Sequence, residues 1–268
     1  MELRIMNPSA PWQNLPPENV FLAVDSSGRQ HGMSYLIYQH LPHLYPDRPV
    51  NIFFSLQADD RARAMLLGTV IGRGRALRDN APEEPARLYT CLEPDDHSGR
   101  VFYSHSGFDH IDSEDIYQLK LVQPMQLPAG FEIRAIPLAT PMHQGAFVAR
   151  LQANDMYQIS ASYLQVLLQS QHVCAVGLIN NGNQLVGEAL WSGISDSCEL
   201  NAVYIAPQWR HQGCGRLLLT QCMMYLSQRG VYNFHARLSS RSTPQMRLAA
   251  DLQGQTARTM ALMPSLDM

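Results

Sequence analysis

The chain has 268 residues, of which 46% are hydrophobic and 16% are charged, a composition typical of globular rather than disordered proteins. Its formal net charge of −3 leaves no basic excess for binding nucleic acid or an anionic membrane. The 5 cysteines are irregularly spaced, with no Cys-x-x-Cys pair, which argues against a disulfide framework and a structural zinc site. The sequence opens with no apolar signal region and holds no long apolar run. We therefore expect a cytoplasmic protein with no membrane span and no metal.

The first half of the chain carries several segments with strand or helix signals. Strand patterns occupy residues 2–6, 20–24, 32–38, 50–56, 88–92 and 116–122, and helix patterns occupy residues 61–78 and 98–106. The turn signal Asp25-Ser26-Ser27-Gly28, between the second and third strands, predicts a hairpin. A linker is predicted over residues 124–130, where prolines and a glycine interrupt the chain near its midpoint.

The second half begins with a strand pattern followed by two helix patterns. Strand patterns occupy residues 131–136, 173–179, 185–191, 200–205 and 234–238, and helix patterns occupy residues 142–152, 160–170, 213–229 and 244–252. Asn180-Asn181-Gly182-Asn183 predicts a tight hairpin turn whose two central residues take positive φ angles. Gly230 is expected to terminate the longest of these helices.

The two halves repeat one order of elements: a hairpin, a strand, a long helix, a strand, a short helix and a strand. We therefore predict a tandem repeat of one α/β unit, with domains at residues 1–125 and 126–268. The halves differ in charge, because residues 1–130 hold 11 basic and 16 acidic residues, whereas residues 131–268 hold 9 and 7. The less acidic half is the better place for a polyanionic ligand.

One segment of the second half combines a strand, a tight loop and the start of a helix. The loop reads Arg210-His211-Gln212-Gly213-Cys214-Gly215-Arg216. Glycine lets a ligand approach the backbone closely, and the first amides of a helix lack partners and carry partial positive charge. This predicts an anion site suited to a pyrophosphate, to which the two arginines add charge. The Walker A and Rossmann patterns do not fit, because the Gly-Lys-Ser/Thr ending and the third spaced glycine are absent.

The segment resembles the cofactor motif of the GNAT N-acetyltransferase superfamily. In that motif a strand ending in hydrophobic-x-Pro leads to an aromatic residue and Arg, and then to Arg/Gln-x-x-Gly-x-Gly/Ala; every part is present, in order, from Ile205 to Gly215. The element order over residues 131–262 is also similar to one GNAT domain, and the first half is similar to a shorter copy. The resemblance implies two tandem GNAT-like domains, each a mixed, mostly antiparallel sheet flanked by helices.

The resemblance also implies the activity: direct transfer of an acetyl group from acetyl-CoA to a primary amine of a small-molecule or peptide acceptor. The cofactor-binding residues that it implies are Val203, Ile205, Arg210, His211, Gln212, Gly213, Cys214, Gly215 and Arg216. A backbone N–H near Tyr204 or Ile205 would stabilise the charge that develops on the thioester oxygen. Glu199 and Glu188 are the candidate general bases, and each has the alternative of being a solvated charge at a strand end.

Two departures from the family pattern leave alternatives open. The helix over residues 244–252 lacks the Tyr that many relatives use as an acid. A weakly active or inactive CoA-binding regulatory protein is therefore the second interpretation, and a scaffold without a cofactor is the third. Residues 61–66, at the phosphate-loop position of the first half, contain no glycine, so we expect a degenerate copy that binds no CoA, in which Tyr103 is a core aromatic. The protein is expected to be a pseudo-dimeric monomer or a homodimer, and the identity of the acceptor is left open.

Overall fold

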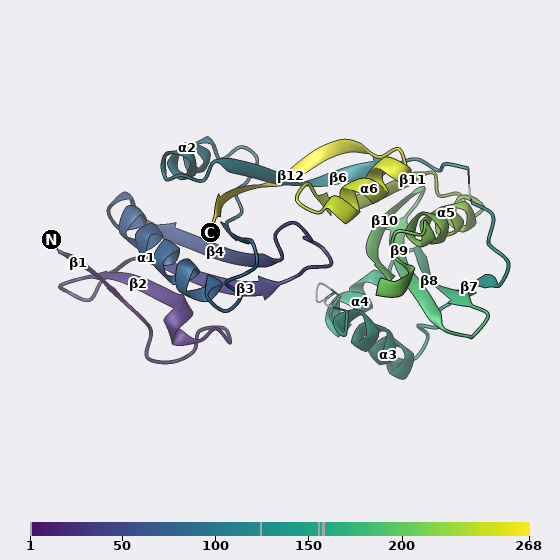
Figure 1. The fold of residues 1–268 in the computed structure, drawn as a ribbon, viewed down its shortest axis with the longest axis horizontal. Coiled ribbons are helices and arrows are strands. Elements are labelled where there is room, and N and C mark those ends of the chain that lie inside the picture. Colours follow the sequence, from purple (N-terminus) through teal and green to yellow (C-terminus); the bar gives the residue numbers. More distant parts are fainter. Residues whose placement is uncertain (1, 124, 155, 157–158) are drawn as a thin grey trace. The chain divides into compact units, whose positions relative to one another are not determined.

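The computed structural model describes residues 2–123, 125–154, 156 and 159–268, and Figure 1 shows its elements. The chain divides into two compact units. Unit 1 comprises Met1–Glu114, Ser240–Thr243 and Met260–Met268, and unit 2 comprises Asp115–Ser239 and Pro244–Thr259. Strands β6 (His110–Leu119) and β12 (Gln255–Asp267) therefore each supply residues to both units. Pro124, the first residue of the predicted linker, lies outside the described residues.

Unit 1 is a mixed sheet with a long helix packed against one face (Figure 1). Its own elements are β1 (Leu3–Met6), a 3-10 turn (Pro17–Asn19), β2 (Val20–Asp25), β3 (Gln30–His40), β4 (Val50–Ala58), α1 (Asp60–Arg78), β5 (Ala86–Tyr89) and α2 (His97–His105). Neighbouring strands are antiparallel from β1 to β4, whereas β4 and β5 are parallel. The end of β12 is antiparallel to β5, with Ser265 opposite Tyr89, so the last residues of the chain complete this sheet.

Helix α1 forms where the sequence offers a capping residue and an apolar stripe. Asp59 is the N-cap, and its side chain accepts hydrogen bonds from two amides of the first turn, which satisfies groups that a helix start leaves unpaired. Leu66 and Val70, one turn apart, are fully buried and belong to the same cluster as Ile52 and Phe54 of β4. The sheet face that α1 covers is therefore the core of unit 1.

Unit 2 repeats this plan and adds two helices before its hairpin. Its elements are β7 (Phe131–Ala135), α3 (Pro141–Gln152), α4 (Ala161–Leu167), β8 (His172–Asn180), β9 (Leu185–Ile194), β10 (Ser197–Ile205), a 3-10 turn (Pro207–Trp209), α5 (Cys214–Ser227), β11 (Asn233–Ser239) and α6 (Thr243–Asp251). The strand order is β7-β8-β9-β10-β11, with β6 next to β11. Strands β7 to β10 are antiparallel to their neighbours, and β10 and β11 are parallel.

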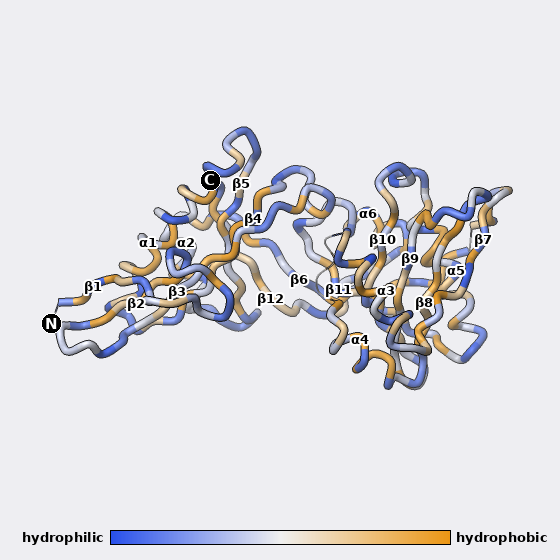
Figure 2. The backbone as a smooth tube through the Cα atoms, turned by 90° about the horizontal axis from the view of Figure 1, so that it is seen from below, coloured by the Kyte–Doolittle hydropathy of each residue, from blue (hydrophilic) through white to orange (hydrophobic). Residues whose placement is uncertain are grey.

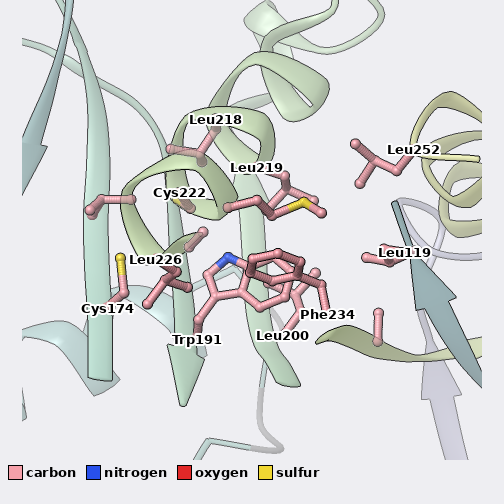
Figure 3. Packing of buried hydrophobic residues seen from close by; sticks show 14 of the residues in the cluster. Leu119, Cys174, Trp191, Leu200, Leu218, Leu219, Cys222, Leu226, Phe234 and Leu252 are labelled. Carbon is pink, nitrogen blue, oxygen red and sulfur yellow. The ribbon is translucent and has the colours of Figure 1, made fainter. Parts of the chain in front are cut away.

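The two faces of the unit 2 sheet carry separate apolar clusters. On one face, α3 and α4 pack through Phe147 and Leu164 against strand residues of β8, β9 and β10. On the other face, α5 lies over Trp191, which is fully buried and meets Phe234 edge to face at 5.7 Å between ring centroids. Figure 3 shows this second cluster, with Leu226 of α5 near the two rings. The helices thus fix β9, β10 and β11, the strands that position the site.

The predicted fold class is confirmed, because both units are mixed sheets flanked by helices, and the predicted elements are present with small shifts of their ends. Figure 2 shows the patterning behind these predictions, with hydrophobic colour over much of strands such as β4 and β8 and hydrophilic colour at many turns. The longest predicted helix of the second half is shorter than expected, since α5 covers Cys214–Ser227. Gly230 does take a left-handed conformation, with φ of 86°.

The predicted turn of the β8–β9 hairpin is wrong in its details. Asn183, with φ of 57°, has a positive φ, whereas Asn181 and Gly182 do not. The side chain of Asn180 accepts hydrogen bonds from the amides of Gly182 and Gln184, each at 3.0 Å. This side-chain bonding closes a longer loop in which an Asn takes the left-handed position, so the two-residue Asn-Gly turn does not form.

Candidate active site

Strands β10 and β11 pair at their amino ends and then separate. Their parallel register runs from Ser197 opposite Asn233 to Leu200 opposite Ala236 and stops there. At this point the register of β10 with β9 also shifts, which leaves Asn201 as a bulged residue. The carboxyl end of β10 therefore has one edge with no strand partner within the described part of the chain.

The backbone groups on this open edge follow from the register with β9. The amide of Ala206 donates to the carbonyl of Val186 in β9 at 2.8 Å. In an antiparallel pair, alternate residues point both backbone groups toward the same partner. The N–H of Tyr204 thus faces β9, whereas the N–H groups of Val203 and Ile205 face the separation between β10 and β11. Of the residues predicted to donate to a thioester oxygen, Ile205 has the required direction and Tyr204 does not.

Helix α5 begins at this separation without a side-chain cap. Its N-cap is Gly213, with φ of 79°, a left-handed conformation that glycine adopts without strain. Leu217 donates to the carbonyl of Gly213 at 2.9 Å, but the amides from His211 to Arg216 have no backbone acceptor in the described structure. A row of unpartnered N–H groups at a helix start attracts anions.

Gly215 shows that this helix start has room for a ligand. A Cβ atom built on Gly215 would meet only side chains at ordinary contact distances, Leu248 Cδ1 at 3.7 Å and Ile205 Cγ1 at 3.8 Å. Packing within the protein therefore does not require a glycine there, whereas close approach of a pyrophosphate to the backbone does. The residues at this helix start fit the pyrophosphate of CoA.

The side chains around the loop have distinct roles. Arg210 donates from Nε to the carbonyl of Ile205 at 2.9 Å, and its guanidinium carbon lies 5.9 Å from the centroid of the Tyr204 ring. Arg216 has a buried Nε atom with no partner in the described residues. Cys214 is buried, and burial raises the pKa of its thiol, so it packs as a small apolar residue.

Glu188 and Tyr204 lie directly opposite each other on β9 and β10. Glu188 is only 1% exposed, and its Oε2 atom accepts from Nη2 of Arg150 at 3.0 Å and from Nε at 3.3 Å. Its Oε1 atom is buried and has no donor in the part of the chain that the structure describes. Burial raises the pKa of Glu188, and the hydrogen bond and charge of Arg150 oppose that shift. A buried carboxylate with one free oxygen is a candidate proton acceptor.

Glu199 lies apart from this pair. It is exposed and sits opposite His235 in the paired, amino-terminal part of β10. Five residues of extended chain separate it from Tyr204, a distance of roughly 15 Å along the strand. The structure therefore brings Glu188, and not Glu199, to the level where β10 and β11 have separated.

A cavity of about 330 Å³ lies between α3 and strands β7 and β8, next to Arg150, the ion-pair partner of Glu188. Its lining includes Arg150, His143 and Gly177, and Gly177 is the register partner of Glu188 on β8. The Nδ1 atom of His143 is buried and has no partner among the described residues. The sequence analysis missed Arg150 and His143, because Arg150 and Glu188 are 38 residues apart and no local pattern marks the pair.

A tyrosine from outside α6 reaches that helix. Tyr117 of β6 donates its hydroxyl hydrogen to the Sδ atom of Met246 in α6 at 3.5 Å. The corresponding helix of unit 1 carries Tyr103, which is 5% exposed and contacts the rings of Phe54 and Phe108. Burial raises the pKa of Tyr103 to about 12, so Tyr103 is the core aromatic that was predicted.

The structure adds two general findings about ligands and membranes. No group of three or more His, Cys, Asp or Glu side chains could hold a metal ion among the residues that the structure describes. Within those same residues, every helix is too short or too polar to cross a membrane.

Comparison with known proteins places this geometry in a family. The model of the acetyltransferase (GNAT) family matches residues 142–253, the segment from α3 to the end of α6. A GCN5-related N-acetyltransferase from Sphaerobacter thermophilus is similar over 96% of this chain and 83% of its own, at 14% identity and a TM-score of 0.51. A tandem GNAT protein from the clavulanic acid biosynthesis pathway is 13% identical over 99% and 98% of the two chains, but its TM-score of 0.48 is too low to support an argument. Comparison with curated proteins gives no match.

These matches support an acyl-transfer function, and proteins of this family generally use acetyl-CoA. The structural likeness at 14% identity concerns the fold alone. Unit 1 repeats the order and register of unit 2 without its two early helices. Residues 142–253 thus form an acetyltransferase domain of the GNAT family, in a chain built from two tandem GNAT-like units.

Proposed function

We propose that the chain is an N-acetyltransferase that moves the acetyl group of acetyl-CoA to a primary amine by direct attack. The observation that carries the proposal is the row of unpartnered amides from His211 to Arg216, next to the separated ends of β10 and β11. An anion-binding helix start and an open strand edge, side by side, suit a pyrophosphate and the thioester attached to it.

The binding roles follow from the direction of each backbone group. The amides of Gln212 to Arg216 hold the pyrophosphate, and Arg216 adds a guanidinium group whose Nε atom has no partner in the described residues. When bound, acetyl-CoA supplies the activated acetyl group. The N–H of Ile205, or that of Val203 two residues earlier, would donate a hydrogen bond to the carbonyl oxygen of the acetyl group. This bond would stabilise the negative charge that develops on that oxygen during attack.

Glu188 is the group that we propose as the base. The attacking amine must lose a proton, and the buried Oε1 atom of Glu188 is an acceptor with no donor in the described structure. Arg150, which binds the other oxygen of Glu188, also lines the cavity between α3 and strands β7 and β8, and we propose that the amine enters through that cavity. The amine nitrogen bonds to the acetyl carbon, the carbon–sulfur bond breaks, and the amine proton passes to Glu188, directly or through water. Glu199 is exposed and distant, so we assign it no chemical step.

Tyr117 is the group that we propose as the acid for the leaving thiolate. α6 has no Tyr of its own, but the Tyr117 hydroxyl lies 3.5 Å from Sδ of Met246 in that helix. Tyr117, Val203 and Ile205 all pack against the same apolar cluster. A proton from the Tyr117 hydroxyl would convert the thiolate to the thiol of free CoA. Tyr117→Phe should lower kcat by about tenfold with little change in KM.

Isothermal titration of acetyl-CoA into the full chain tests the binding step. The wild type should bind one acetyl-CoA per chain, and the double variant Gly213→Glu with Gly215→Glu should bind none, because two carboxylates would occupy the anion site. A thiol-release assay with a panel of primary amines then tests turnover. No binding to the wild type would overturn the proposal.

A second candidate function is a CoA-binding regulatory protein with little or no turnover. The observation that favours it is the absence of Tyr from α6, Thr243–Asp251. Binding of acetyl-CoA without thiol release, across the whole amine panel and across pH, would select this function. Thiol release that depends on Glu188 would exclude it.

We also propose that the two halves predicted as domains, residues 1–125 and 126–268, differ in function, with a single CoA site in the second half. Support comes from α1, whose first amides already have an acceptor in Asp59. A stoichiometry of two acetyl-CoA molecules per chain would contradict this part of the proposal.

A further inference from the structure

A second polar cavity lies in unit 1, on the part of the sheet that α1 does not cover. Its volume is about 290 Å³, room for roughly ten water-sized groups at about 30 Å³ each. Three arginines line it: Arg48 before β4, Arg87 in β5 and Arg241 in the segment after β11. All three belong to unit 1, since Ser240–Thr243 clusters with that unit. None of the predicted functional residues lies here.

Arg241 contacts two aromatic rings. Its guanidinium carbon lies over both, 4.0 Å from the ring centroid of Tyr89 and 4.5 Å from that of Tyr45, which are cation–π distances. Its Nη1 donates to Asn51 Oδ1 at 3.3 Å and its Nη2 donates to the Tyr45 hydroxyl at 3.2 Å. Next to it, Ser242 donates to the carbonyl of Leu44 at 2.8 Å. The guanidinium plane is thus fixed before any ligand arrives.

The carboxylates around the cavity do not satisfy Arg241. Arg87 pairs with Asp112, and Arg48 pairs with Asp267, each at 2.5 Å. The partners of Arg241 are aromatic rings, a tyrosine hydroxyl and an amide, all of them uncharged. Asp47 also lines the cavity, and it accepts a hydrogen bond from the Thr243 hydroxyl at 3.0 Å. The three arginines thus face three carboxylates, Asp47, Asp112 and Asp267, but none of these carboxylates is a partner of Arg241 in the described structure.

Two guanidinium nitrogens of the cavity residues have no acceptor. The Nε atoms of Arg87 and Arg241 are both buried and unpartnered in the described structure. Burying such a donor without an acceptor is costly. Burial lowers the pKa of Arg87, Asp112 opposes the shift, and the positive charges of Arg241 and Arg48 add to it. A group of mutually repelling cations with free donors is a site where an anion would be stabilising.

We infer that this cavity of unit 1 binds a small ligand through a carboxylate or phosphate group held by Arg241 and Arg87. The planar fork of a guanidinium group matches both oxyanions. The inference does not depend on acetyl transfer, because the cavity, its three arginines and its free donors all lie in the unit that we propose binds no CoA.

The test uses the full chain with Gly213→Glu and Gly215→Glu, so that the α5 loop takes up no anion. Sodium succinate and sodium phosphate, in chloride buffer, are titrated separately and followed by calorimetry. We expect one saturable site per chain for at least one of them, and the anion that binds identifies carboxylate or phosphate as the recognised group. Arg241→Gln should weaken that binding at least tenfold. Arg229→Gln is the matched control, because Arg229 also stacks on a tyrosine, at 3.6 Å from the Tyr225 ring centroid, but in unit 2.

Two outcomes would overturn the inference. One is failure of both anions to saturate the protein at about 10 mM, where a site with a Kd of 1 mM would already be nearly full. The other is unchanged binding in Arg241→Gln, with far-ultraviolet circular dichroism equal to that of the parent. If Arg241→Gln does not fold, Arg48→Gln replaces it, since the Arg48 side chain is 30% exposed. That variant should bind the same anion at least threefold more weakly.

Discussion

The two units share a backbone scaffold and differ in how one helix begins. In unit 1 the central strand β4 pairs with β5 from Val50 to Phe53, and in unit 2 the central strand β10 pairs with β11 from Ser197 to Leu200. Both pairings then stop, so both units have separated strands. In both, a glycine faces the last residue of the central strand: Gly32 opposite Ala58, and Gly187 opposite Ile205.

The difference lies between the central strand and its helix. Unit 1 has a single residue there, Asp59, whose carboxylate caps α1 by accepting from the amides of Arg61 and Ala62 at 3.1 Å each. Unit 2 has the longer segment of residues 206–213, and α5 starts at Gly213 without a side-chain cap. The start of α1 is thus capped by a carboxylate of the chain itself, whereas the start of α5 has no such cap and can accept an external anion. A shared fold therefore leaves an uncapped helix start at this position in one unit only, and the length and residue types of the connection between strand and helix account for the difference.

The largest effect should come from copying the unit 1 cap into unit 2. In Gly213→Asp, the new carboxylate can accept from the free amides of the first turn and repel a pyrophosphate. We expect acetyl-CoA to bind at least about 100-fold more weakly, a loss of about 2.7 kcal/mol. Isothermal titration of the full chain measures it.

Gly213→Asn is the matched control for that variant. Asn has the same shape, adopts the left-handed conformation of Gly213 with similar strain, and can cap the helix without a negative charge. We expect acetyl-CoA binding to fall only about tenfold. Equal losses in the two variants would mean that space or strain, rather than charge, separates the two units.

The next effect concerns Glu188 and Tyr204, which face each other beside the open edge of β10. The residues at the corresponding positions of unit 1 are Met33 and Gln57. Glu188→Gln keeps an oxygen for the bond to Arg150 but cannot take a proton, so kcat should fall by about 100-fold. Glu199→Gln should change kcat by less than about threefold, because Glu199 lies in the paired part of β10.

The pH dependence of kcat/KM gives a second test of Glu188 as the base. Burial raises its pKa above the ordinary glutamate value of 4.5, and the base acts only when deprotonated. The kcat/KM of the wild type should therefore fall with decreasing pH at a value above 4.5, and this limb should be absent in Glu188→Gln. A limb that survives the substitution would assign the base to another group.

Much of this comparison could be predicted from local sequence. Period-two and helical patterns placed most strands and helices, and the run from Ile205 to Gly215 indicated the open helix start. Two features depend on contacts between distant residues, which carry no local signal: the ion pair of Glu188 with Arg150, and the pairing of Ser265 with Tyr89 that places the end of the last strand in unit 1. The hairpin turn failed for a different reason, because hydrogen bonds to the Asn180 side chain overrode the preference of an Asn-Gly pair.

A smaller effect should follow from removing the cap of unit 1. In Asp59→Ala two amides of α1 lose their acceptor, so the urea midpoint of unfolding should drop by on the order of 0.5 M. Asp59→Asn retains an acceptor and should drop less. Neither variant should gain a second acetyl-CoA site, because the connection to α1 stays one residue long and lacks glycine. A measured stoichiometry of two would show that the cap alone keeps CoA out of unit 1.

The smallest effect is a pH dependence confined to the capped helix start. His31 lies between Asp25 and Asp59, with ring nitrogens 2.9 Å and 2.8 Å from their carboxylates. Hydrogen bonds to Asp25 and Asp59 raise the pKa of His31 above 6.5, against burial. Because the folded-state pKa is the higher one, this stabilisation is fully present below about 6.5 and is lost as pH rises through the folded value. Amide hydrogen exchange of α1 should therefore quicken, beyond its intrinsic pH dependence, as the pH rises above about 6.5, and His31→Gln should remove that excess. Exchange of α5 should show no such excess, since no side chain caps its start in the described structure.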